Sequence, residues 1–97
     1  MRTLYFIRDS VTKTYYWNAC NSFGHPFADA VIHTTETSVK SGVKTRNTMF
    51  RKDLKIPDED CSGRYAWLKK NRGAARKREN LPDFGMEIIA VEIQDPA

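Results

Sequence analysis

The chemistry that this chain could perform is concentrated in one basic stretch, residues 64–78 (RYAWLKKNRGAARKR). It has seven cationic side chains and no acidic one, with Tyr65 and Trp67 among them. Clustered cations bind the phosphates of nucleic acids, and aromatic rings stack on unpaired bases. The same composition also occurs on ordinary solvated helices, so both interpretations stay open. The cations are Arg64, Lys69, Lys70, Arg72, Arg76, Lys77 and Arg78.

A second group of cations precedes this stretch. Residues 40–78 hold thirteen Lys and Arg and four acids, a net charge of +9, whereas the rest of the chain carries −5. A focused field attracts an anionic partner more effectively than a diffuse one. The sequence therefore favours binding to nucleic acid, or to the acidic face of a protein that handles nucleic acid. The cations that would extend the surface are Lys40, Lys44, Arg51 and Lys52.

Three consecutive aromatic residues offer a second way to hold bases. Tyr15, Tyr16 and Trp17 fall in a segment that is typical of a strand. Aromatic side chains on a sheet can stack RNA bases. A small domain also needs its aromatic residues inside, and we favour this core interpretation.

Residues that ligate metals or act as nucleophiles are few. Cys20, His25, His33 and Cys61 match no zinc-binding spacing, so we expect no metal site and no cofactor. Cys20 with a histidine could form a nucleophile pair, and a histidine could serve a small nuclease. The adjacent acids at 58–60 could hold Mg²⁺, although plain solvation is the more common role of such a run.

The totals are those of a single small domain covering residues 1–97. Apolar runs all fall short of the roughly 18 residues that span a bilayer, and the N-terminus does not read as a signal peptide. We therefore expect no membrane association and a cytoplasmic location. In that compartment Cys20 and Cys61 should remain reduced rather than form a disulfide.

Hydrophobic patterning predicts an α+β domain. It indicates a small, mostly antiparallel sheet of about four strands, beginning with a hairpin, and one or two helices packed on one face. Alternating and β-branched residues indicate the strands, and periodic apolar residues indicate the helices. The expected strands are 3–7, 13–17, 28–33 and 86–93, and the expected helices are 36–51 and part of 65–79.

The helix over 36–51 has the clearest signals. Thr34 and Thr35 are N-cap candidates, and the apolar stripe consists of Val39, Val43 and Phe50 together with the stem of Arg46. Gly42 lowers helix propensity but would permit a close approach to the sheet.

In the second helix we expect three side chains to point inward and one residue to interrupt the helix. The inward residues are Tyr65, Leu68 and Ala75, and the interruption is expected at Gly73.

Several of these segments together resemble a class of small, mostly uncharacterised accessory proteins encoded by bacteriophages. The segments are YFIRD at 5–9, KTYY at 13–16, FADAVI at 27–32, the Thr-capped helix with Thr45-Arg46, and EIIAVE at 87–92. The resemblance implies a protein that binds a host molecule in the host cytoplasm, in host takeover or counter-defence. The basic stretch lies outside it.

We therefore expect a non-enzymatic protein that binds nucleic acid, or a host protein that handles it, through a basic surface. A small His-dependent nuclease and a purely structural or oligomeric module are the alternatives. The expected binding residues are Lys40, Lys44, Arg51, Lys52, Arg64, Tyr65, Trp67, Lys69, Lys70, Arg72, Arg76, Lys77 and Arg78.

Overall fold

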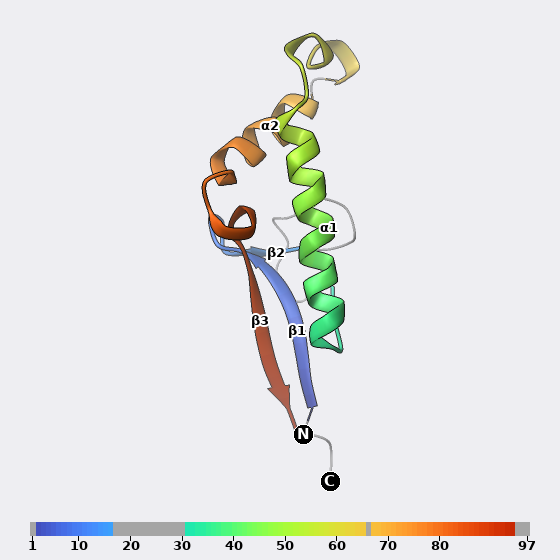
Figure 1. The fold of residues 1–97 in the computed structure, drawn as a ribbon, viewed down its shortest axis with the longest axis vertical. Helices are drawn as coiled ribbons and strands as arrows, with labels where there is room; N and C mark the ends of the chain where they lie inside the picture. Colours follow the sequence, from blue (N-terminus) through green and yellow to red (C-terminus); the bar gives the residue numbers. More distant parts are fainter. Residues whose placement is uncertain (1, 17–30, 66, 95–97) are drawn as a thin grey trace.

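The computed structural model describes residues 2–16, 31–65 and 67–94, and it confirms the α+β class (Figure 1). Two helices and a three-stranded antiparallel sheet form its main elements, with short 3-10 helices between them. In chain order these are β1 (Arg2–Asp9), β2 (Thr14–Tyr15), α1 (Glu36–Leu54), η2 (Asp58–Asp60), η3 (Gly63–Tyr65), α2 (Trp67–Arg78), η4 (Pro82–Gly85) and β3 (Met86–Ile93).

The sheet has the order β2-β1-β3, with β1 at its centre. Strand β1 pairs with β3 along its whole length, from Arg2 opposite Ile93 to Asp9 opposite Met86. The N-terminal and C-terminal strands of the described chain are thus neighbours, and the helices lie in the connection between them. The last strand has the bounds that the sequence predicted.

The first hairpin differs from its predicted form. Strand β1 continues to Asp9, and β2 is only two residues long before the chain leaves the described part at residue 17. Of the strand expected at 28–33, only 31–33 is described, and it forms a single bridge between His33 and Tyr5. The described sheet therefore has three strands instead of about four. Trp17, Cys20 and His25 lie outside the described residues.

Helix α1 begins and packs as its sequence predicts. The side chain of Thr35 accepts a hydrogen bond from the backbone N–H of Ser38 at 3.0 Å, which caps the first turn. The helix continues three residues beyond the predicted end. Its buried residues are Val39, Val43, Arg46 and Phe50.

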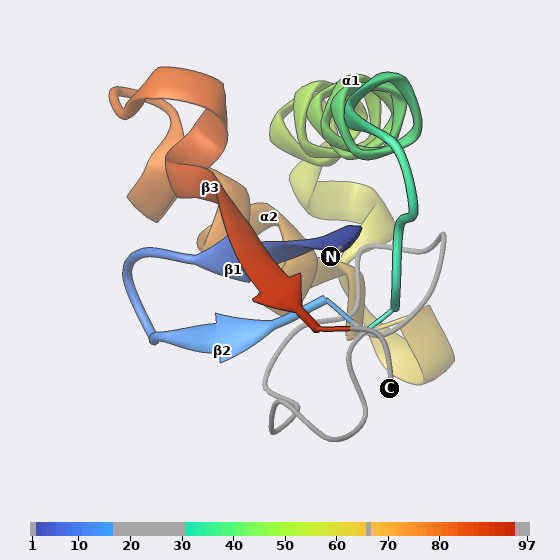
Figure 2. The same ribbon diagram turned by 90° about the horizontal axis from the view of Figure 1, so that it is seen from below.

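Gly42 explains how closely α1 approaches the sheet. A Cβ at this position would lie 3.1 Å from Ile7 Cδ1 and 3.2 Å from His33 Cε1. Such contacts are tighter than ordinary van der Waals separation, so the close approach depends on glycine here. In Figure 2, which looks along the long axis, α1 lies above β1 and β2.

Both helices contribute to one hydrophobic core. Ile7 and Met86 from the strands meet Val39, Val43 and Phe50 from α1 and Ala75 from α2. Phe84 of η4 stacks on Phe50, with ring centroids 5.1 Å apart. Ala75 is fully buried, as expected, and α2 passes through Gly73 without interruption, so the prediction of a break there was wrong.

In the described part of the chain, no helix combines the length and the apolar character that crossing a membrane requires.

Replacing Val43 with Asp tests the packing of α1. Val43 is 7 % exposed, so the new carboxylate would be buried without a partner. We expect the free energy of unfolding to fall by roughly 3 kcal/mol or more, measured by chemical denaturation. The control is Thr45→Asp on the exposed side of α1, which should change stability by less than about 1 kcal/mol. Equal stability of the two variants would show that α1 is not packed on the core.

Candidate nucleic-acid interface

The last arginine of the basic stretch is buried in an ion pair. Arg78 Nε donates a hydrogen bond to Asp9 Oδ1 at 3.0 Å, and Nη2 donates to Oδ2 at 2.6 Å. Its third nitrogen, Nη1, donates to the backbone carbonyl of Ala74 at 2.8 Å. Asp9 is 0 % exposed and Arg78 is 2 % exposed. Arg78 therefore joins α2 to β1, and it is removed from the expected binding surface.

The carboxylate of Asp9 also organises the hairpin turn. It accepts hydrogen bonds from Thr12 Oγ1 at 2.6 Å and from the backbone N–H of Val11 at 3.3 Å. Burial alone would raise the pKa of Asp9. The hydrogen bonds from Arg78 and Thr12, together with the positive charge of Arg78, outweigh burial and hold this pKa below its ordinary value. One ionised carboxylate thus connects α2 with the β1–β2 turn.

Arg72 is a second arginine that is buried and paired within the fold. It is 7 % exposed, and its Nη1 donates to the carbonyl of Ile56 at 2.9 Å and lies 2.6 Å from Asp58 Oδ1. These contacts hold the segment after α1 against α2. Arg72 points inward because Leu68 and Ala75, four residues before and three after it, occupy the same side of the helix. It too is removed from the expected surface.

Four cations of α2 remain exposed, and they surround one glycine. Lys69, Lys70, Arg76 and Lys77 stand four and three residues before and after Gly73, so the helical repeat places them around it. A Cβ at Gly73 would meet nothing within 4 Å. This group of five residues is called the basic face of α2 below. Glycine costs a helix about 1 kcal/mol relative to alanine, and no packing contact here requires it.

One side of the basic face forms the wall of a groove. The groove has a volume of about 380 Å³ and lies between α2 and the β1–β2 turn. Its lining contains two of the exposed lysines, the small residues between them and the ion-paired Arg78, with the turn opposite. These residues are Lys70, Gly73, Ala74, Lys77 and Arg78 from α2, and Val11 and Thr12 from the turn.

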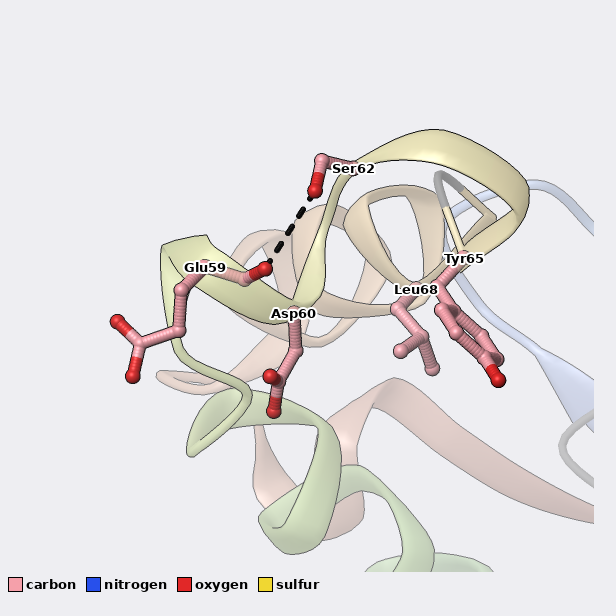
Figure 3. Close-up of a pocket in the computed structure, with 5 residues that line it drawn as sticks. All are labelled: Glu59, Asp60, Ser62, Tyr65 and Leu68. Carbon is pink, nitrogen blue, oxygen red and sulfur yellow. Dashed lines mark hydrogen bonds between the residues drawn. The ribbon is translucent and has the colours of Figure 1, made fainter.

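The two aromatic residues of the basic stretch lie in different surroundings. Trp67 is 56 % exposed at the start of α2. Tyr65 is 48 % exposed, so the prediction that it points inward was wrong. It lines a pocket of about 470 Å³ together with Glu59 and Asp60 (Figure 3). Because that pocket carries carboxylates, it does not suit a phosphate group.

The remaining expected residues occupy other places. Lys40 and Lys44 line a hollow of about 300 Å³ between α1, η4 and β3. There, Asn47 Nδ2 donates to Asp83 Oδ1 at 3.1 Å. This hollow shares no lining residue with the groove beside α2, so the cations of the two helices do not line one cavity. Arg51 and Lys52 are exposed near the end of α1, and Arg64 belongs to η3.

The described residues of the other candidate chemistries, His33, Cys61 and the acids at 58–60, have the following surroundings. His33 Nδ1 lies 2.9 Å from Ser38 Oγ, and burial, followed by the charge of Arg46, lowers its pKa. The thiol of Cys61 is free and donates to the carbonyl of Pro57 at 3.5 Å. Within 2–16, 31–65 and 67–94, no group of three His, Cys, Asp or Glu side chains could hold a metal ion.

Tyr15 and Tyr16 contribute to the packing of the fold. Tyr16 is 1 % exposed, and the guanidinium of Arg46 lies 5.0 Å from the centre of its ring. Burial is the main reason why the pKa of Tyr16 is raised. Tyr15 makes an edge-to-face contact with Phe6. These two rings therefore stabilise the fold, in agreement with the favoured interpretation of the sequence.

No family model, curated protein or solved structure matches this chain. The interpretation of the site therefore depends on its own contacts. The residues that the sequence did not indicate are Asp9, and Val11 and Thr12 beside the groove. The spacing of Leu68, Arg72 and Ala75 is the signal that could have placed Arg72 inside.

Replacing Arg78 or Arg76 with Met tests whether the first arginine stabilises the fold and the second lies only on the surface. Arg78→Met leaves the buried Asp9 without its cation, so we expect a loss of about 3–5 kcal/mol in the free energy of unfolding. Arg76 is exposed, so the same substitution there should change stability by about 0.5 kcal/mol or less. Chemical denaturation of both variants provides the measurement. A similar stability for both would contradict the buried pair.

The ion pair also predicts a dependence of stability on pH. A carboxylate whose pKa is lower in the folded state stabilises the fold above its unfolded pKa of about 4. This stability is lost as the pH falls through the folded pKa. We expect the stability difference between the wild type and Asp9→Asn to be constant near neutral pH and to shrink below about pH 4. A difference that stays constant down to pH 2 would show that folding leaves the pKa of Asp9 unchanged.

Proposed function

We propose that this protein acts by binding nucleic acid through the basic face of α2, and not by catalysing a reaction. The observation that supports this most directly is the state of its cations. Lys69, Lys70, Arg76 and Lys77 are all exposed, and none of them forms an ion pair with another described residue. Two acids near α2 are paired with other cations, Asp9 with Arg78 and Asp58 with Arg72.

The distribution of paired and exposed cations on the two sides of α2 supports the same proposal. The arginines that are paired face the interior, and the cations that remain face solvent on a rigid helix. Such cations displace the counterions of a polyanion, and this release provides much of the affinity of nucleic-acid complexes. In the phage context that the resemblance implies, binding of this kind would serve interference with the nucleic-acid machinery of the host.

Charge reversal tests the proposal. The variant Lys69→Glu/Lys70→Glu/Arg76→Glu/Lys77→Glu should lose most of its affinity for labelled DNA or RNA. Each lost phosphate contact should flatten the log–log salt dependence by about 0.7–0.9. Melting should change little, because exposed charges contribute little to stability. Binding is measured by fluorescence anisotropy across a salt series.

The matched control reverses four cations outside the basic face, namely Lys40, Lys44, Arg51 and Lys52. It should retain the larger part of the affinity and of the salt dependence. Wild-type affinity in the α2 variant would refute the proposal. Binding to a protein that depends on one or two anchor residues and is indifferent to nucleic acid would also refute it. Cleavage of the labelled strand by the wild type would instead support the nuclease alternative.

A further inference from the structure

The groove beside α2 has features that a general affinity for polyanions does not explain. We infer that it holds a single strand of nucleic acid, with the sugar–phosphate backbone crossing α2 at Gly73 between Lys70 and Lys77. This inference rests on the proposed function and specifies its ligand. Three observations carry it: the open space at Gly73, the lining of the groove, and the position of Trp67.

The first observation is a contrast between the two helical glycines. Packing within the fold requires a glycine at position 42, because a Cβ there would press against Ile7 and His33. No packing contact requires a glycine at position 73, because a Cβ there would meet nothing within 4 Å. Glycine is the residue that permits another backbone to approach closely. At Gly73, any group that uses this space would come from outside the described residues.

The second observation is the arrangement of charge around that opening. Lys70 and Lys77 are separated by seven residues, or about 10 Å along the helix axis. Both line the groove, and Gly73 and Ala74 lie between them without long side chains. A phosphodiester backbone can therefore reach the surface of α2 with an ammonium group on each side. The opposite wall offers the aliphatic side chain of Val11, which is 46 % exposed, and Thr12.

The third observation selects a single strand instead of a duplex. Trp67 precedes Lys70 by three residues and Ala74 by seven, so it lies on the same side of α2 as the groove. Its side chain is 56 % exposed, which is unusual for so large an apolar surface. An indole in this position can stack on an unpaired base, which a single strand supplies and an intact duplex does not. The cations then follow the backbone while the indole holds a base.

The central test is Gly73→Gln, assayed with labelled oligothymidylate, oligouridylate and duplex DNA. Glutamine is a better helix former than glycine, so the melting temperature should rise by roughly 2–6 °C. The added side chain blocks the approach to α2, so affinity for the single strands should fall about tenfold or more. The control Ser41→Gln adds the same side chain on the exposed part of α1 and should leave affinity unchanged.

The variant Trp67→Leu is the second test of this inference. Loss of stacking should reduce affinity for single strands by roughly five- to a hundredfold. The slope of the salt dependence should remain, because the cations are intact. Duplex affinity should be weaker than single-strand affinity and insensitive to this variant.

Unchanged single-strand affinity in Gly73→Gln would overturn the inference. So would a duplex that binds as tightly as the single strands and loses the same affinity in Trp67→Leu. If either result occurs while charge reversal on α2 still abolishes binding, the proposed function stands. In that case the nucleic acid binds through the cations of α2 but not in the groove. If charge reversal has no effect either, both fail.

Discussion

The buried pair between Asp9 and Arg78 is the interaction on which the rest of this structure depends. It joins the end of the central strand to the last residue of α2, 69 positions later in the chain. Because two parallel hydrogen bonds fix the guanidinium against the carboxylate, the pair sets the orientation of the helix as well as its position. Removing either partner would leave the other charge buried without compensation, so breaking the pair costs much of the stability of the fold.

The pair also decides which side of α2 faces solvent. Once Arg78 and Ala75 point toward the sheet and Arg72 holds the segment at Ile56 and Asp58, the other side of the helix must be exposed. Gly73 and the cations around it lie on that side. The same carboxylate receives the hydrogen bonds of Thr12 and Val11, so the turn that forms the opposite wall of the groove is fixed by the ion pair too. Stability and the shape of the candidate site thus have one common origin.

Local signals were sufficient for much of the fold. The N-cap of α1, its buried stripe and the strand at Met86–Ile93 follow from side chains that are close in sequence, and each was predicted from them. The short β2 and the extent of the sheet were less predictable, because strand length depends on pairing partners that are far away in the chain. Gly73 was expected to interrupt a helix, but the tertiary contacts of Arg72, Ala75 and Arg78 outweigh its low propensity.

The sequence by itself determined the composition of the basic stretch and its net charge. Only the tertiary structure decided which of the cations on α2 face solvent. The six cations of α2 separate into buried and exposed ones because Asp9, contributed by the opposite end of the chain, is brought within hydrogen-bond distance of Arg78, and Asp58 is brought to Arg72. The physical reason is that burying a cation requires a partner, and the identity of that partner depends on contacts between residues remote in sequence.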